Sequence, residues 1–420
     1  MYTANTGNIV ITPQQAMPLA GFADRTQNYE GISDDLEINL LAIKQQDQFY
    51  LLYSVDTFFV PEEFVKVVID RFGAQYHIDE SNIWMCASHT HFAPSLDSEK
   101  PRLGVCNRAY YDLVKDRLLS LTADVLQGTF SEVSINYSNG DADINVNRRK
   151  RLLRFNKGRL TRKTLLLPDY EGAKNTAMHL LTITDANGLV LAYLWSYACH
   201  PVHAFSKNNV SAEYIGAIRS NMRKHTGKSN LAIVFFQGFA GNLKADITAV
   251  TGMRKADSLR YMLQLWPTHV AFPSAQAYGD WVGLLWIKMN AIIMQAAKIP
   301  VTGRLTSKIY KMPLSDIIGN RQDAEIVFKK ICFGNVLAFV SISAEVVTEY
   351  TLLVRQLMQE RNVVDVAYTE GSHTYLPVDY MLPEKGYEVE GFKTLFGIEG
   401  DFKPSLDRKI ADALTELNNA

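Results

Sequence analysis

Polar side chains that can bind a metal follow three apolar segments of the chain. The residues that follow these segments are His89-Thr90-His91, His200-Pro201-Val202-His203 and Ala344-Glu345. Loops at strand ends in α/β sheets converge on one edge, which is where such sheets place their binding sites. The two-residue repeat of a strand puts both histidines of a His-x-His pair on one face, so both can address one centre. Catalytic zinc usually takes three ligands from histidine and carboxylate and leaves a position for water, so this pattern is typical of a zinc site.

The same residues also allow a purely structural interpretation. A lone histidine beside an apolar strand is more often a hydrogen-bonded structural residue than a ligand, and His-x-His sequences are common. His200 can be a loop residue that Pro201 fixes, and we interpret His203 as a loop residue. The spacing alone therefore leaves both interpretations open.

An alternation of strand and helix patterns predicts the elements that position these residues. Residues 49–56 and 82–88 form apolar runs typical of buried strands, and residues 61–75 carry apolar side chains at helical spacing. Further strands are predicted at 188–198, 231–237 and 335–342, and further helices at 213–225, 280–298, 344–360 and after Ser405, which is the predicted N-cap. This order indicates an α/β fold with covered sheets, and we expect residues 1–420 to form a single domain.

The composition argues against several classes of partner. The 420 residues are 47% hydrophobic and carry a formal net charge of -1, so the overall charge does not attract nucleic acid. The chain has no uninterrupted run of about 18 or more apolar residues, so we expect no membrane-spanning helix. The N-terminal residues lack the features of a secretory signal, and the four cysteines show neither metal-type pairing nor a disulfide framework. These features favour a cytoplasmic protein.

One segment concentrates basic charge. Residues 148–163, RRKRLLRFNKGRLTRK, contain nine lysines and arginines in a chain that is close to neutral. The segment allows two interpretations: a docking patch for an anionic substrate, a phospholipid headgroup or a partner, or a solvated surface hairpin that turns at Asn156-Lys-Gly158. The aromatic segment from Tyr278 to Trp286 also allows two interpretations: it lines an acyl-chain tunnel, or it packs in the core, which is the interpretation that we favour.

Several short segments share the residues and the order of one family's motifs. They are Met17-Pro-Leu-Ala-Gly-Phe-Ala23, Ser88-His-Thr-His-Phe-Ala-Pro94, Asn147-Arg148, Ala198-Cys-His-Pro201, Val210-Ser-Ala-Glu-Tyr-Ile-Gly216 and Gln237-Gly-Phe-Ala-Gly-Asn-Leu243. These segments resemble motifs of the neutral/alkaline, non-lysosomal ceramidase family. The most specific match is to its Thr-His-Thr-His-Ser-Gly-Pro signature.

This resemblance implies a ceramidase-like zinc hydrolase catalytic domain of mixed β-sheets flanked by helices. It implies a zinc ion (Zn2+) held by His89, His200, Glu345 and Tyr375, with His91, Arg148 and Tyr387 as catalytic residues. Tyr387 follows Tyr375 at the interval found in the family, and Glu349 competes with Glu345 for the carboxylate position. The implied reaction is hydrolysis of a small-molecule or lipid-like N-acyl amide, such as ceramide, by metal-activated water.

The chain also departs from the family. Lys244 stands where the family has a serine once considered a nucleophile, a residue that a metal-hydroxide mechanism does not need. The short segment after Tyr387 reads as a loop and a helix, so we expect no C-terminal immunoglobulin-like domain. These departures weaken ceramide as the substrate and keep two alternatives open: an amide-forming or acyl-transfer enzyme, and a degenerate homologue that binds a ligand without turnover. Asp246 is the only guess for a second metal.

Overall fold

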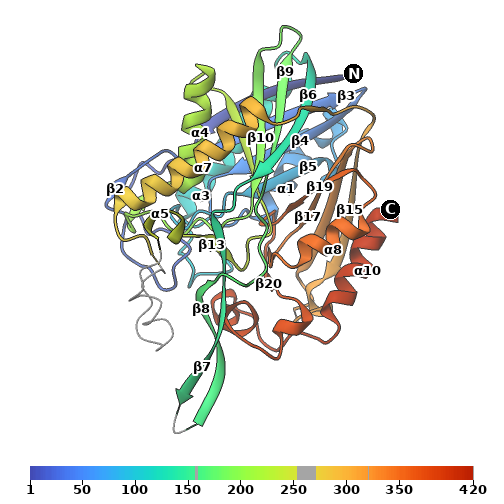
Figure 1. Ribbon diagram of the computed structural model, residues 1–420. Helices are drawn as coiled ribbons and strands as arrows, with labels where there is room; N and C mark the ends of the chain where they lie inside the picture. The colour runs from blue at the N-terminus through green and yellow to red at the C-terminus, as the bar shows by residue number, and fades with distance from the viewer. Residues whose placement is uncertain (157–158, 253–270, 320, 420) are drawn as a thin grey trace.

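Two mixed β-sheets packed face to face form the framework of the protein, and helices cover the outer face of each sheet (Figure 1). The computed structural model describes residues 1–156, 159–252, 271–319 and 321–419. The layers are, in order, helices, the larger sheet, the smaller sheet and helices. This arrangement confirms the expected α/β class with mixed sheets flanked by helices.

The larger sheet spans both halves of the sequence. Its strands are β1 Tyr2–Val10, β3 Glu37–Gln45, β4 Gln48–Val55, β5 Ile83–Ala87, β6 Ser131–Asp141, β9 Ala177–Asp185, β10 Val190–Tyr197, β12 Ala232–Gln237 and β14 Ile299–Pro300. The order is β12-β10-β9-β6-β1-β3-β4-β5, with β14 paired to β6. The β4–β5 and β10–β12 pairs are parallel. The sheet coils until the ends of β5 and β12 meet, where the Gln237 N–H donates to Cys86 Sγ at 3.3 Å.

The smaller sheet closes the core from the other side. It has the order β15-β16-β17-β19, with bounds Leu305–Pro313, Glu325–Phe333, Leu337–Ile342 and Asn362–Val366. Its inner face packs on the larger sheet, and the rings of Phe236 and Phe339 meet across the interface at 5.7 Å. The central strand β17, LAFVSI, is almost wholly apolar because both of its faces are covered, whereas the edge strand β15 is mostly half-buried and carries polar side chains.

Helices fill the two outer layers. The larger sheet is covered by α1 Glu62–Val68, α3 Arg108–Gln127, α4 Glu213–Thr226 and α7 Ala275–Gln295. The smaller sheet is covered by α8 Tyr350–Leu357 and α10 Leu406–Asn419. Side chains that bind free backbone N–H groups start two of the long helices: Asn107 accepts from Tyr110 and Ser274 accepts from Ala277. Shorter turns are η1 Ile69–Gly73, α2 Ala74–Tyr76, η2 Glu80–Asn82, α5 Thr248–Thr251, η3 Leu314–Asp316, η4 Asp379–Met381, η5 Tyr387–Gly391 and α9 Lys393–Phe396.

All of the predicted strands occur, but one predicted helix starts in the wrong place. Residues 344–360 were expected to be helical, whereas α8 begins only at Tyr350. Glu345–Val346 forms the short strand β18, which pairs in parallel with β20, Tyr375–Leu376. The N-cap predicted at Ser405 has the right position, because α10 begins at Leu406 and the Ser405 carbonyl oxygen accepts from the Lys409 N–H at 3.1 Å. The side-chain acceptor for the N–H groups of Leu406 and Asp407 is the Asp379 carboxylate.

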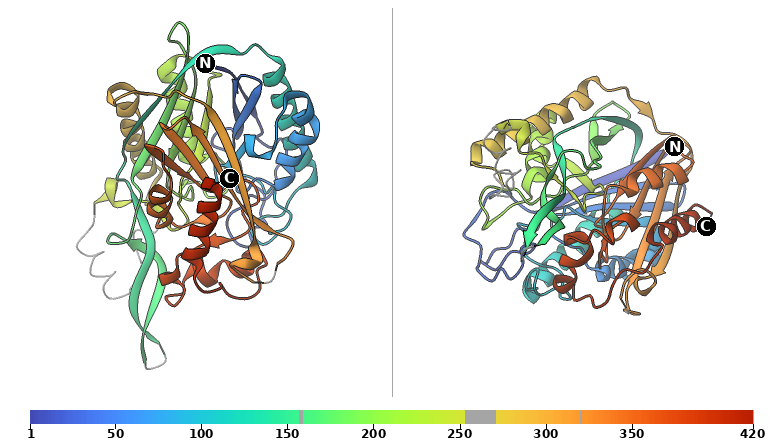
Figure 2. Two further views of the ribbon diagram at one scale, coloured as in Figure 1. Left: turned by 90° about the vertical axis from the view of Figure 1, so that its right-hand side faces the viewer. Right: turned by 60° about the horizontal axis from the view of Figure 1, so that its bottom comes forward.

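A long hairpin leaves the body of the protein. Its strands are β7 Asn145–Asn156 and β8 Arg159–Asp169, and β13 Leu243–Ala245 pairs with the base of β7. Figure 1 and the left view of Figure 2 show the distal part of the hairpin projecting away from the sheets. The predicted hairpin is therefore confirmed, while residues 157 and 158 of its predicted turn lie outside the described residues. The remaining short strands, β2 Gly31–Ile32 and β11 Asn209–Val210, pair with each other.

Three further expectations concern the cysteines, membrane-spanning helices and the aromatic segment of α7. The four cysteines are all free. Within the described ranges, no helix combines the length and apolar character needed to cross a membrane. Trp281, at the centre of the aromatic segment in α7, is buried against Tyr214 and Phe272, as core packing requires.

Candidate metal centre

Two imidazoles and one carboxylate converge where three strands end or begin. Nε2 of His89 lies 3.1 Å from Nε2 of His200 and 3.4 Å from Oε2 of Glu345. Nε2 of His200 lies 3.8 Å from the same carboxylate oxygen. All three side chains are buried, and Oε2 of Glu345 makes no hydrogen bond within the described part of the structure. The structure thus places three of the four predicted ligands in one cluster.

The other nitrogen of each imidazole determines what this cluster can bind. Nδ1 of His89 lies 2.9 Å from the Phe58 carbonyl oxygen, and Nδ1 of His200 lies 3.1 Å from the Ala240 carbonyl oxygen. A carbonyl oxygen only accepts, so each Nδ1 carries the hydrogen and each Nε2 presents a lone pair. Two lone pairs and an unpaired carboxylate oxygen then face one another, an arrangement that a cation satisfies and a hydrogen bond does not. Metal-binding histidines characteristically donate their second N–H in this way.

The backbone around His89 is shaped to hold its ring. β5 ends at Ala87, and His89 itself takes a left-handed conformation with φ of 61°. Its ring is stacked between Phe58 and Tyr368, with centroids 4.4 and 4.1 Å away. A non-glycine residue in this region of φ is uncommon and is found where the surroundings fix it, as at functional sites.

Glu345 and Tyr375 lie side by side in a single ladder. They are register partners in the β18–β20 pair, and the Glu345 N–H donates to the Thr374 carbonyl oxygen at 2.9 Å. Gly241 packs directly on this strand, where an added Cβ would come within 2.7 Å of the Glu345 carbonyl oxygen. Glu349, the competing carboxylate, instead accepts from Asn242 and Tyr380. The carboxylate beside the imidazoles is therefore that of Glu345.

His91 lies at the edge of the cluster. One of its ring nitrogens falls within 4.8 Å of those of His89 and His200, a looser set than the one that includes Glu345. Burial, followed by the neighbouring His89, holds the pKa of His91 well below its ordinary value. Its Nε2 atom has no hydrogen-bond partner in the part of the chain that the structure describes. Gly21 packs against the ring, and a Cβ there would come 2.5 Å from it.

Arg148 connects the cluster to the two tyrosines. Its Nη2 atom donates to the Gly241 carbonyl oxygen at 2.8 Å and to the Tyr375 hydroxyl oxygen at 3.1 Å. Its Nε atom pairs with Glu388 at 3.1 Å, and its guanidinium lies 5.7 Å from the ring centroid of Tyr387. Burial raises the pKa of Tyr387 to about 12, so its hydroxyl keeps its proton. The predicted catalytic residues Arg148 and Tyr387 are therefore close to the predicted ligand Tyr375.

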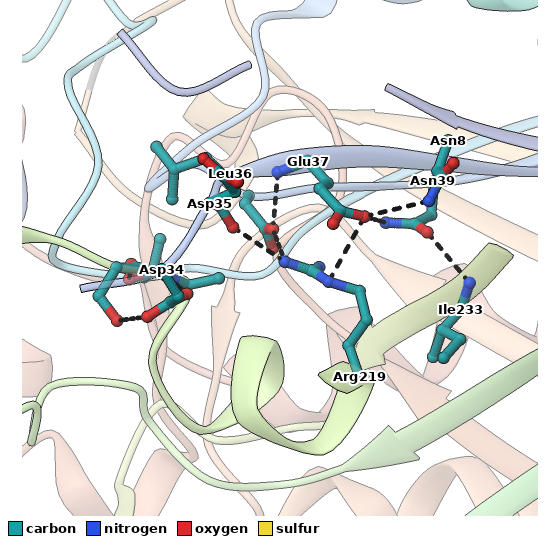
Figure 3. Close-up of polar contacts among 12 residues, drawn as sticks. Asn8, Asp34, Asp35, Leu36, Glu37, Asn39, Arg219 and Ile233 are labelled. Carbon is teal, nitrogen blue, oxygen red and sulfur yellow. Dashed lines mark hydrogen bonds and ion pairs between the residues drawn. The ribbon is translucent and has the colours of Figure 1, made fainter. Parts of the chain in front are cut away.

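A buried ionic network lies behind the cluster and fixes the start of α4. Arg219 of α4 pairs with Asp56 at 2.7 Å and with Glu37 at 3.5 Å (Figure 3). Asp34, three residues before Glu37 at the start of β3, accepts hydrogen bonds from the Ser211 hydroxyl and the Ala212 N–H. The Ser211 carbonyl oxygen in turn accepts from Thr90, between His89 and His91. Asp56, which closes β4, is therefore a structural anchor of this network.

The sequence did not indicate several residues that hold the site. Tyr368 stacks on His89, Phe58 supplies its carbonyl acceptor, and the buried Glu388 pairs with both Arg148 and Arg149. Tyr368 follows the strand β19, an apolar run that ends in polar residues just as β5 does, and this signal could have identified it. Glu388 and Phe58 have no comparable signal, because their partners lie far away in the sequence.

No protein-family model matches the chain, and no curated protein matches it. Solved structures match it in fold. Neutral ceramidase from Pseudomonas aeruginosa superposes with a TM-score of 0.76 at 15% identity, over 100% of this chain and 74% of that chain. A ceramidase complexed with C2 superposes with a TM-score of 0.75 at 15% identity, over 99% of this chain and 74% of that one. The chain has a neutral-ceramidase-like fold.

Proposed function

We propose that this protein is a zinc-dependent amidohydrolase that cleaves an N-acyl amide bond. The observation that carries the proposal is the convergence of two imidazole lone pairs and a carboxylate oxygen in a buried cluster. We assign His89, His200 and Glu345 as zinc ligands and Tyr375 as the fourth protein ligand. We also propose that residues 1–420 act as one catalytic domain.

The donor set fits zinc in chemistry and in spacing. Nitrogen and carboxylate ligands are those of catalytic zinc, and bonds of about 2.0–2.1 Å in a tetrahedral site put neighbouring donor atoms roughly 3.3 Å apart. The three distances between donor atoms are 3.1, 3.4 and 3.8 Å. When bound, zinc supplies a water molecule of lowered pKa and polarises the amide carbonyl group.

The remaining residues act on the charges that amide hydrolysis creates. The carbonyl oxygen gains negative charge as its carbon becomes tetrahedral, and N–H and O–H donors aimed at that oxygen lower the barrier. Arg148 and the protonated Tyr387 are such donors, and Glu388 holds the Arg148 guanidinium in place. His91, with a buried and unpaired Nε2, is suited to move a proton to the departing amine nitrogen.

The fold favours a lipid-like amide as substrate. Two solved structures with this fold are described as ceramidases, so ceramide and other long-chain N-acyl amines are the first substrates to test. Lys244 does not weaken the proposal, because water activated at the metal replaces any nucleophilic side chain. A release of free fatty acid from N-acyl amines by the zinc-loaded protein is the expected activity.

The decisive experiment combines metal analysis with a substrate screen. Purified protein should contain about one zinc per chain, and His89→Ala combined with His200→Ala should lose both the zinc and the hydrolysis of short-chain and long-chain N-acyl amines. Protein that binds no zinc, or retains it in the double variant, would contradict the proposal. Net amide formation from acyl donors and amines, with no hydrolysis, would favour the synthetic alternative. Binding of these amides without chelator-sensitive turnover would identify a degenerate homologue.

A further inference from the structure

The β7–β8 hairpin is called the arm below. Neither the fold nor the proposed metal centre explains the exposed side chains of its distal half. The distal half stands clear of both sheets in Figure 1 and in the left view of Figure 2. An isolated two-stranded hairpin is marginally stable in water, and its two faces would ordinarily be covered or made polar. Three of the large hydrophobic side chains that are exposed in the described residues lie on the arm or directly after it: Leu153, Leu166 and Tyr170.

The basic side chains of the arm divide into a paired base and an unpaired distal part. At the base, Arg149 pairs with Glu388, Lys150 with Asp169, and Arg151 with Glu384. Further out, Arg162 and Lys163 are exposed and form no ion pair with any described residue. The chain has a net charge of -1, so this unneutralised charge is a local feature that is not required for overall solubility.

The register places the apolar and basic side chains of the arm side by side. Leu153 is opposite Arg162, and Arg151 is opposite Thr164, so these four side chains share one face of the arm. Leu166 lies further along the same face, opposite Arg149. Leu153 is 45% exposed and Leu166 is 43% exposed. A face that mixes exposed leucine with unpaired arginine has both features that attract a protein to an anionic membrane surface.

We propose that the arm docks on an anionic lipid surface, with Arg162 near the headgroups beside Leu153 and Leu166 in the interfacial region. Lys163, which pairs with Leu152 on the opposite face, adds positive charge at the same level of the arm. This inference goes beyond the proposed function and does not depend on turnover. Its geometry is nevertheless informative about the site, because the same strand carries Arg148. Leu153 is five positions after Arg148, about 17 Å along an extended strand. A docked arm would therefore hold the metal centre close to the lipid surface.

The test is co-sedimentation with vesicles of phosphatidylcholine alone or with about one third phosphatidylglycerol, using protein to which no amide substrate is added. We expect binding to the anionic vesicles only, weakened by added salt. Arg162→Glu combined with Lys163→Glu should weaken this binding at least tenfold. The matched control reverses two exposed basic charges outside the arm, Arg408→Glu with Lys298→Glu, and should bind within about twofold of the unmodified protein.

A second pair of variants tests the apolar contribution. Leu153→Ser should weaken vesicle binding several-fold, whereas Leu352→Ser, which alters a leucine of α8 that is 65% exposed, should not. Unchanged melting temperatures would establish that each variant is folded. Equal binding to neutral vesicles, or no effect of the arm variants, would overturn the proposal. The proposal would also be overturned if the unmodified protein and Leu153→Ser bound a soluble polyanion equally well while neither bound vesicles. It would likewise be overturned if the arm variants lost the ability to dimerise and lipid binding was not what they changed. Zinc content and hydrolysis of dispersed short-chain amides report separately on the proposed function.

Discussion

Glu345 supplies the negative charge of the metal centre, because histidine binds a metal as an uncharged imidazole and the Nε2 atoms of His89 and His200 are the two that face the carboxylate. Glu345→Gln keeps the shape of the side chain and removes this charge. We expect zinc affinity to fall at least about 100-fold, since ligand loss exceeds the roughly 10-fold to 100-fold cost of losing a supporting residue. Competition with a chelating dye measures the affinity.

Glu349→Gln is the matched control for that substitution. Glu349 lies four residues further along the chain and contacts Asn242 and Tyr380, not the imidazoles. Its substitution should leave zinc affinity within about threefold of the unmodified protein. Equal losses in the two variants would mean that the ligand assignment is wrong.

Arg148 and Arg149 form a second matched pair, because both bind Glu388 but only Arg148 also reaches Tyr375. Lysine has one nitrogen and cannot bind Glu388, Gly241 and Tyr375 with the planar geometry of a guanidinium. We expect Arg148→Lys to lower kcat about 10²-fold to 10³-fold, as loss of an oxyanion donor does, with zinc content unchanged. Arg149→Lys should lower kcat by less than about tenfold. A similar kcat loss in both variants would show that Arg148 and Arg149 act only by holding Glu388 in place.

The carboxyl group of Asp34 should make the stability of the protein depend on pH. Burial raises the pKa of its carboxyl to about 6, against hydrogen bonds from Ser211 and Ala212 that lower it. The folded protein then holds this proton between about pH 4 and pH 6 while the unfolded chain releases it, so stability from this group falls as pH rises through that window. Asp34→Asn removes the titration and keeps an acceptor for Ala212.

The expected result is therefore a pH-dependent difference between the two proteins. Relative to the unmodified protein, Asp34→Asn should gain about 1–2 kcal/mol of unfolding free energy from pH 4 to pH 7, less than the roughly 3 kcal/mol of a full two-unit shift, because Asp34 keeps some contact with water. Urea unfolding at several pH values measures this. A constant difference across the range would contradict the raised pKa.

At the scale of elements, the sequence predicts what is local and misses what is paired at a distance. The strands that precede His89 and His200 are contiguous apolar runs, so both their existence and the residues at their ends could be read directly. Glu345 was predicted to lie at the site, but within a helix. Its true element, β18, exists only because β20 pairs with it from about thirty residues away, and neither strand exceeds two residues.

The same reasoning explains the two other gaps in the prediction. α10 does begin after Ser405, but the carboxylate that accepts from its first N–H groups belongs to Asp379, which the sequence separates from the helix, so only the position of the cap could be predicted. The buried Glu388 that orients Arg148 lies 240 positions away from it. Short-range patterns do not contain such contacts, whereas the resemblance to a family did indicate Tyr375 and Tyr387, which the structure brings within 5.5 Å of each other.

Two glycines test how tightly the elements hold the site. Gly241 touches β18, and a Cβ there would come 2.7 Å from the Glu345 carbonyl oxygen and 2.8 Å from that of Val346. Because both neighbours are backbone, Gly241→Ala must displace β18, and we expect a loss of about 2 kcal/mol in stability together with weaker zinc binding. Gly279→Ala, in α7 with nothing within 4 Å, should instead stabilise by about 0.5–1 kcal/mol. Denaturant unfolding and zinc titration of both variants measure these effects, and an unchanged zinc affinity in Gly241→Ala would contradict the packing argument.

At the scale of the whole molecule, the metal centre joins the two sheets. His89 and His200 follow strands of the larger sheet, while Glu345 follows β17 of the smaller sheet. A ligand that binds only the folded protein stabilises it by about 4 kcal/mol at a thousandfold excess over Kd. For a chain of this size, that free energy corresponds to a Tm change of about 5 °C.

Removal of the metal should therefore lower the Tm of the protein, and the loss should be specific. A chelator should lower the Tm by about 5 °C and zinc should restore it, whereas magnesium, which prefers oxygen ligands, should not. Glu345→Gln should melt near the temperature of the chelated protein and respond little to either reagent. Calorimetry of the two proteins with and without chelator provides the comparison. An equal chelator effect in Glu345→Gln would place the stabilising metal elsewhere, and no effect in the unmodified protein would mean that the convergent lone pairs of His89 and His200 are not a zinc site.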